Sequence, residues 1–205
     1  MSRILPGVPK LWNATIESHR AVVRNAILDA TMALVAERGL LGVTMADIAS
    51  RAGIGRATLY KYFADAEAIL RAWHEREIGG HLAEVAAIAE GPGDAAARLA
   101  AVLERYATNA HSGHGRHDAE LAALLHRDGQ VAAARHRLHN LVADLVAEAS
   151  ADGAVRDDIA ADESAAYCLA ALSAVNELHS AAAVRRLVHL TLAGLSPDAA
   201  LRTPR

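Results

Sequence analysis

The chain has 205 residues, of which 53% are hydrophobic but only 3% aromatic, and its formal net charge is −3 at pH 7. This length suits one or two small domains with a buried core, and an alanine-rich composition with few aromatic residues favours close-packed helices over a β-sandwich. We therefore predict an all-α protein, and the net acidity excludes a protein that coats nucleic acid through charge alone.

Charge is distributed unevenly along the chain. Residues 1–64 carry eight Lys or Arg against four Asp or Glu, whereas residues 65–205 carry 13 against 20. A basic first part on an acidic remainder is typical of a protein that docks one end onto phosphates.

The chain begins with a segment that has no helical pattern. Residues 1–16 are predicted to form a flexible arm, in which Arg3 and Lys10 can follow phosphates or a minor groove. From about Ser18 a helix is predicted, and Gly39 ends it as a C-terminal cap. The apolar stripe of this helix consists of Val23, Ile27, Ala30 and Leu34.

Two short helices follow, separated by a glycine turn. Thr44 and Asp47 have the three-residue spacing of a capping box, which starts a helix. Gly53 can adopt a positive φ, so it ends this helix and begins the turn. The second short helix covers residues 56–62. This arrangement predicts a helix-turn-helix, whose second helix can lie in the major groove of DNA.

The same stretch resembles the operator-binding core of the tetracycline-repressor (TetR) family. The resemblance covers about residues 20–70 and is carried by ERG at 37–39, GVT at 42–44 and RATLYKYF at 56–63. It implies a homodimeric transcriptional regulator with a three-helix DNA-binding head. A long helix would join this head to a helical domain for effector binding and dimerisation.

The motif and the resemblance together select candidate DNA-binding residues. Arg56 has a donor fork that fits a guanine edge or a phosphate, and Thr58 offers a hydroxyl and a methyl group to bases. The resemblance places Tyr60 and Thr44 against phosphates. Core packing is the alternative role for Tyr62. The complete set is Thr44, Arg56, Ala57, Thr58, Tyr60, Lys61 and Tyr62.

One position departs from the family pattern. Ala66 stands where the family commonly has a lysine, near the start of the fourth helix. A phosphate contact is therefore missing, or Lys61 and the helix N-terminus near Asp65 replace it.

The predicted DNA-binding domain covers residues 17–64, and the remaining residues 65–205 form the second predicted domain. Its first helix, at about 65–89, contains Gly79-Gly80 as a weak point, and Gly91-Pro92-Gly93 breaks the chain after it. The other helices are predicted at about 95–110, 118–127, 130–151, 162–178 and 181–195.

Three aromatic residues are candidates for an effector pocket. Trp73, Tyr106 and Tyr167 stand among leucines and alanines, where few buried charges are expected. We therefore expect an apolar or weakly polar small organic effector, which moves the helix that begins at Asp65 and thereby the DNA-binding head. Core packing is the alternative role for each aromatic residue.

The last two helices form the predicted homodimer interface. A palindromic operator in double-stranded DNA requires two heads related by a two-fold axis. Small and branched side chains let two copies pack as a four-helix bundle, with Glu177, Arg185 and Arg186 at its rim. The predicted interface residues are Ala170, Ala174, Val184, Leu187, Leu190 and Thr191.

Eleven histidines raise an alternative, a helical enzyme or metal-responsive protein with a vestigial DNA-binding head. His111, His114 and His117 recur every three residues, and His136 and His139 share a helical face, spacings that can bind zinc or nickel. Nearby glycines and an arginine argue against this, so we expect neither a metal nor a cofactor. Catalytic motifs such as G-x-S-x-G and H-E-x-x-H are also missing from the sequence, so we do not expect an enzyme.

The expected location is the cytoplasm. Cys168 is the only cysteine, which excludes an intramolecular disulfide, and its apolar neighbours indicate a buried small hydrophobe. The first ten residues lack an apolar signal core, and no run approaches the about 18 apolar residues of a membrane helix.

Overall fold

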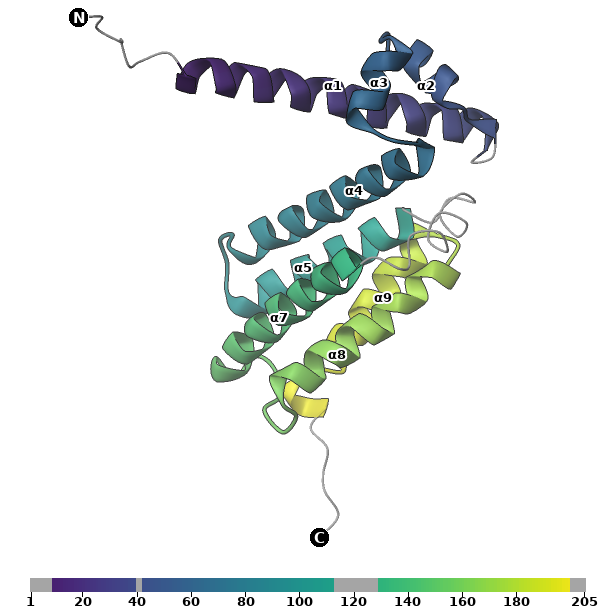
Figure 1. Cartoon of the computed structure of the whole chain (residues 1–205). Helices are drawn as coiled ribbons and strands as arrows, with labels where there is room; N and C mark the ends of the chain where they lie inside the picture. Colours follow the sequence, from purple (N-terminus) through teal and green to yellow (C-terminus); the bar gives the residue numbers. More distant parts are fainter. Residues whose placement is uncertain (1–8, 40–41, 113–128, 200–205) are drawn as a thin grey trace, which may run out of the picture. The chain divides into compact units, whose positions relative to one another are not determined.

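The computed structural model describes residues 9–39, 42–112 and 129–199, of which residues 9–15, 129–130 and 199 are described by backbone alone. All regular structure in these residues is helical (Figure 1), which confirms the predicted all-α fold. No helix in these ranges is both long and apolar enough to cross a membrane.

The chain divides into two compact units, Met1–His74 and Glu75–Arg205. The division falls inside a single helix, α4 (Ala66–Ala89), rather than at the predicted boundary between residues 64 and 65. The first turns of α4 belong to the first unit because Ile69 and Ala72 are buried in its core.

The first unit is built from α1, α2, α3 and the first turns of α4. Helix α1 begins at Pro9 rather than near Ser18, so the predicted arm of residues 1–16 is wrong from residue 9 onward. Proline is favourable at the first helical position because its missing N–H would have no partner there. Gly39 ends α1 with φ +75°, as predicted. The helices are α1 (Pro9–Arg38), α2 (Met45–Arg51) and α3 (Arg56–Tyr62), around a core of Ile27, Leu28, Leu34, Ile48, Leu59 and Ile69.

Helix α4 contributes to both cores but leaves a span between them. Trp73 packs against the first core, and Val85 is the next hydrophobic residue of α4 that belongs to a core, that of the second unit. Gly79 and Gly80 lie in this span and are exposed. A Cβ added at either glycine would meet nothing within 4 Å, so packing among the described residues does not require glycine there.

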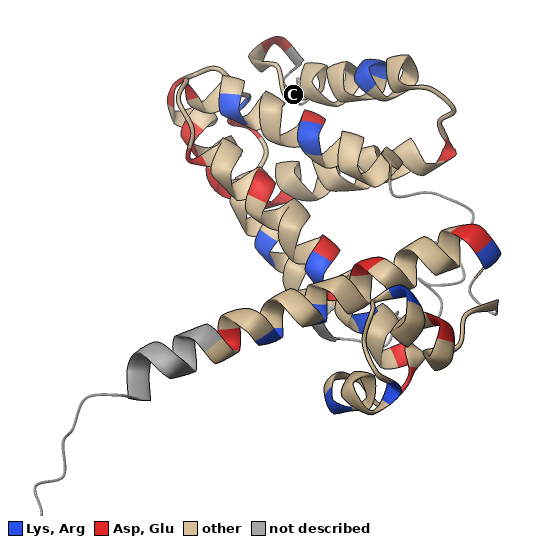
Figure 2. Cartoon of the chain, turned by 90° about the horizontal axis from the view of Figure 1, so that it is seen from above, with Lys and Arg blue, Asp and Glu red and all other residues tan. Residues whose placement is uncertain are grey.

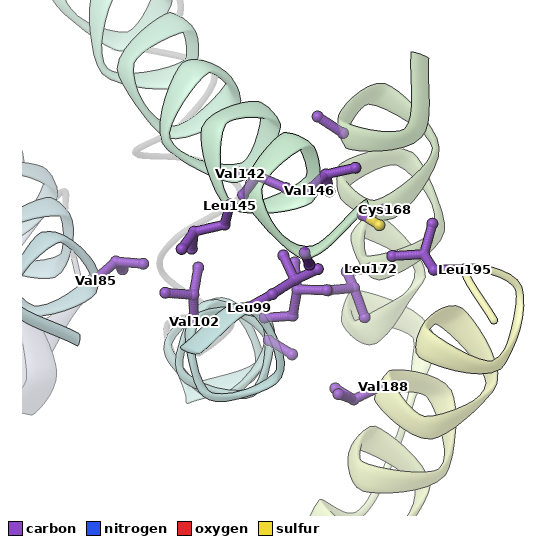
Figure 3. Close-up of a cluster of buried hydrophobic side chains, with 14 of the residues drawn as sticks. Val85, Leu99, Val102, Val142, Leu145, Val146, Cys168, Leu172, Val188 and Leu195 are labelled. Carbon is purple, nitrogen blue, oxygen red and sulfur yellow. The ribbon is translucent and has the colours of Figure 1, made fainter. Parts of the chain in front are cut away.

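The second unit is a helical bundle around one apolar core. Helix α7 lies beside α5 and α8, and α9 also lies beside α5 and α8. Figure 3 shows the side chains that meet between these helices, among them the fully buried Leu99 and Leu172. The elements are α5 (Ala95–Ser112), α7 (Gly129–Ala151), α8 (Ala161–Leu172), the 3₁₀ helix η2 (Ser173–Glu177), α9 (Ala181–Ala193) and the 3₁₀ helix η3 (Pro197–Ala199).

The helix predicted at 162–178 ends as an α-helix at Leu172 and continues as the 3₁₀ helix η2. The helix predicted at 118–127 lies outside the described residues.

Candidate nucleic-acid interface

Helix α2 starts with the predicted capping box. The Thr44 hydroxyl accepts a hydrogen bond from the Asp47 amide at 3.2 Å, while the Thr44 hydroxyl and amide donate to the Asp47 carboxylate at 2.5 and 3.2 Å. These bonds, aided by the charge of Arg38 at 3.4 Å, hold the pKa of Asp47 below its usual value. Their stabilisation is therefore present at neutral pH and is lost as the pH falls through that lowered pKa.

The turn between α2 and α3 depends on Gly53. This residue has φ +68°, a left-handed conformation that glycine adopts without a Cβ penalty. The Gly53 amide donates to the Ser50 carbonyl at 3.2 Å, and the Ile54 amide donates to the Ala49 carbonyl at 3.0 Å. These two bonds end α2 as a Schellman motif and fix the direction in which α3 begins.

Helix α3 has one buried face and one exposed face. Leu59 has no exposed surface, and Phe63, which follows the helix, is 7% exposed. Tyr60 is 56% exposed. Thr58 and Tyr62 are half-buried, and Tyr62 packs against the core of the first unit. The other candidate DNA-binding residues are exposed, namely Thr44, Arg56, Ala57 and Lys61.

Ion pairs divide the cations of the first unit into two groups. Arg51 donates two hydrogen bonds to the Glu37 carboxylate, at 2.9 and 2.7 Å, and these lower the pKa of Glu37. Arg51 and Arg38 thus hold α2 against the end of α1. In contrast, neither Arg56 nor Lys61 forms an ion pair with a carboxylate in the described part of the chain. Their charges remain available to an external anion.

The three aromatic pocket candidates do not gather around one cavity within either unit. Trp73 packs against the core of the first unit. Tyr106 is half-buried against the second core, and burial raises the pKa of its phenol. Tyr167 is 44% exposed, and its hydroxyl lies 2.6 Å from where a Cβ on Gly194 would stand. Tyr167 therefore covers the end of α9 rather than a buried pocket.

The predicted dimer residues fall on two different faces. Val184 is 4% exposed and Thr191 is 1% exposed, and the Thr191 hydroxyl donates to the Leu187 carbonyl at 2.9 Å. Both belong to the interior of their own unit, so their assignment to the dimer interface is wrong. Leu187 is half-buried against the second core. The remaining candidates are exposed, namely Ala170, Ala174 and Leu190.

Three of the histidines considered as metal ligands have local partners. His139 Nε2 lies 2.6 Å from an Asp162 carboxylate oxygen, His136 Nε2 lies 3.4 Å from the Asn140 amide nitrogen, and His111 Nδ1 lies 3.4 Å from a backbone carbonyl. No group of three or more potential metal ligands occurs among the residues that the structure describes. His114 and His117 lie outside those residues.

Cys168 has no exposed surface, and burial raises the pKa of its thiol to about 11. At pH 8 only about 0.1% of such a thiol is ionised, whereas an unfolded chain ionises about 10%. We therefore expect iodoacetamide to alkylate the native protein at least about 100-fold more slowly than the protein in guanidinium chloride. Mass spectrometry of timed samples measures both rates at the single cysteine. Equal rates would place Cys168 on the surface.

One buried charge was missed by the sequence interpretation. Arg156 is 7% exposed and donates two hydrogen bonds to the Asp158 carboxylate, both at 2.7 Å, which raise the pKa of Arg156. Its amide donates to the Leu195 carbonyl at 2.9 Å. Arg156 thus fastens the α7–α8 connector to the end of α9. The Arg-x-Asp spacing is the local signal that indicates this pair.

Two family models match the chain. The model described as bacterial regulatory proteins of the tetR family matches residues 27–73, which include the whole helix-turn-helix. The model described as the C-terminal domain of SbtR-like transcriptional regulators matches residues 92–197, which is more than half of the chain.

Individual proteins show the same similarity. The HTH-type transcriptional repressor LfrR of Mycolicibacterium smegmatis is 37% identical over 91 residues, or 43% of this chain, and the match spans about half (47%) of that relative. A TetR/AcrR-family regulator from Thermobifida fusca aligns with a TM-score of 0.72 and 24% identity over 83% of this chain and 97% of its own. The regulator SCO0520 from Streptomyces coelicolor aligns with a TM-score of 0.60 and 28% identity over 85% of this chain and 98% of its own.

Proposed function

Since the chain belongs to the TetR family of bacterial regulatory proteins, we propose that it is a DNA-binding transcriptional repressor that a small organic ligand releases from its operator. Helix α3 carries this proposal. Leu59 anchors it in the core, while Arg56 and Lys61 project from its exposed face and have no carboxylate partner among the described residues.

The exposed face of α3 suits the major groove, which admits one helix. Arg56 and Thr58 lie in its first turn, the part that contacts base edges in helix-turn-helix proteins, so we assign them to bases. Tyr60 and Lys61, together with Thr44 at the start of α2, are assigned to phosphates. Ala57 allows close approach of the helix to DNA. Tyr62 is assigned a minor DNA contact, because it is half-buried and packs against the core of the first unit. Only the exposed part of its side chain can reach DNA.

A dimer supplies the second recognition helix. Leu190 is the large hydrophobic residue with the greatest exposure among the described residues, at 67%, and Ala170 and Ala174 are also exposed on α8 and η2. Small residues with one large apolar side chain allow close helix packing between two copies. Such a dimer binds a palindrome whose half-sites are about 34–36 Å apart, or a multiple of that distance.

The core of the second unit supports the proposed chemistry of the effector. Its buried members are apolar side chains, and Tyr106 adds a half-buried phenol with a raised pKa. Such a phenol is neutral at physiological pH and can donate or accept one hydrogen bond. We therefore infer an apolar or weakly polar organic effector beside Tyr106. It shifts the equilibrium only by its difference in affinity for the two conformations of the protein.

Helix α4 is the proposed link between effector and DNA, and its glycine pair sets its stiffness. Glycine costs up to about 1 kcal/mol relative to alanine in a helix, and open space surrounds both positions. We expect Gly79→Ala/Gly80→Ala to raise the free energy of unfolding by about 1–2 kcal/mol, measured by urea titration. The same variant should need more ligand to release operator DNA.

Ala83→Gly, an exposed position in the same span, provides the matched control. This control should lower the free energy of unfolding and should not raise the ligand concentration needed to release operator DNA. If the double-alanine variant were more stable but released operator DNA at the same ligand concentration as the wild type, bending of α4 would take no part in release.

A binding experiment tests the proposed function directly. Labelled duplexes that tile the DNA flanking the gene of this protein are compared with random duplexes of the same length in a gel-shift titration. We expect one duplex to bind tightly at a salt concentration that removes the random duplexes. Equal binding to all duplexes, or binding to none of them, would overturn the repressor proposal.

A further inference from the structure

Residues 16–22 of α1 do not contribute to the core of their unit. Every side chain described from Ile16 to Val22 is exposed, whereas Ile27 and Leu28 have no exposed surface. A helical segment without packing partners is only marginally stable in water. The exposed residues of this segment are therefore available to an external surface.

Arg20 lies on this exposed segment, and the half-buried Arg24 follows it one helical turn later. Arg20 and Arg24 are four residues apart, so their side chains leave the same face of α1. The guanidinium carbon of Arg24 lies 5.4 Å from the centre of the Phe63 ring. Phe63 directly follows α3, so this row of cations adjoins the end of the recognition helix, close in sequence to Lys61. Figure 2 shows the basic residues of α1 and of the short helices in blue.

The carboxylates of the first unit leave these arginines unpaired. Glu37 pairs with Arg51 and Asp47 with Arg38, while Asp65 accepts a hydrogen bond from the Ala68 amide at 2.8 Å. In the described residues no carboxylate forms an ion pair with Arg20 or Arg24. Like charges four residues apart weaken a helix slightly. A row of external anions would remove this repulsion.

We propose that Arg20 and Arg24 form a second DNA contact, which binds the phosphate backbone that flanks the bases read by α3. This inference rests on the proposed function, because it needs α3 in the major groove to bring α1 to the adjoining backbone. The contact adds affinity without sequence preference, since phosphates carry no base identity. Glu17, one turn before Arg20, is exposed and opposes the contact by its charge.

Salt-dependent DNA binding tests this contact. Operator affinity is measured by fluorescence anisotropy between low and physiological salt for the full-length wild type, Arg20→Gln and Glu17→Gln. Arg137→Gln, an exposed arginine on α7, is the matched control. Each lost phosphate contact should flatten the plot of log affinity against log salt by about 0.9 per protomer. We expect this for Arg20→Gln, equally on operator and random duplexes, and not for Arg137→Gln.

Glu17→Gln should bind both duplexes more tightly at low salt, a gain that misfolding cannot imitate. On a duplex trimmed to the bases that α3 reads, wild type and Arg20→Gln should bind alike. Suppose that Arg20→Gln instead bound the untrimmed operator duplex with the affinity of the wild type and the same slope of log affinity against log salt. That result would overturn the second contact and would leave the proposed function standing. Failure of the wild type to prefer any operator would overturn the proposed function and this inference with it.

Discussion

Leu190→Glu is expected to convert the dimer into monomers and to lower operator affinity by about 100-fold or more. Two recognition helices that are joined in one dimer gain affinity through their linkage, and this gain is typically about 10²–10⁴-fold. Leu190 is 67% exposed on α9, so its replacement leaves the core of its own unit intact. A two-fold axis brings the substituted face of each copy to the interface, where unpaired carboxylates are costly to bury.

Light scattering measures the mass of this variant, and anisotropy measures its affinity for operator DNA. Ala133→Glu adds the same charge at an exposed position on α7 and should remain dimeric with wild-type affinity. Leu190→Ala should weaken the dimer less than the glutamate does, because it removes only apolar contact area. An unchanged mass for Leu190→Glu would move the interface away from this face.

The helix-turn-helix could be predicted from sequence because its determinants are local. The capping box needs only Thr44 and Asp47, three residues apart, and the turn needs only a glycine that tolerates the left-handed conformation at Gly53. The buried anchor Leu59 follows from the helical spacing of apolar residues. Each of these features is decided within one or two turns of helix, so tertiary contacts do not alter it.

The faces of α9 could not be assigned in the same way. The buried face of α9 consists of residues at helical spacing, Val184, Val188 and Thr191. Because threonine is polar, the sequence pattern does not identify this face as the buried one. Its hydroxyl is satisfied by the Leu187 carbonyl inside the same helix, so burial leaves no unmet hydrogen bond. The composition of α9 therefore suggested a dimer interface at residues that lie in the interior of their own unit.

The surroundings of the aromatic pocket candidates were the least predictable feature, because they depend on contacts between segments far apart in sequence. Tyr167 lies against Gly194, the residue that ends α9, whereas Trp73 packs in the first unit. The hydrogen bond from the Arg156 amide to the Leu195 carbonyl is another contact between segments far apart in sequence. Helical periodicity indicates that a residue lies on the apolar face of its helix, but it does not indicate which other helix that residue contacts.

Two substitutions on α3 are expected to impair DNA binding in different ways. Lys61→Ala should weaken binding to operator and random duplexes alike and should flatten the salt dependence by about one unit per protomer, because it removes a phosphate contact. Arg56→Ala should instead relax the sequence preference and cost about 1–3 kcal/mol on the operator, because a bidentate contact to a base is lost.

Both side chains are exposed and form no ion pair with described carboxylates, so the fold of the first unit should survive either change. Circular dichroism and the urea midpoint check this before binding is compared. Affinities for the operator, a single-base variant of it and a random duplex then separate the two roles, with Arg137→Ala as the control. If Lys61→Ala and Arg56→Ala lost equal affinity for all three duplexes, neither side chain would read a base. Recognition would then rest on Thr58 or on the shape of the DNA, which a helix can read through phosphate contacts alone.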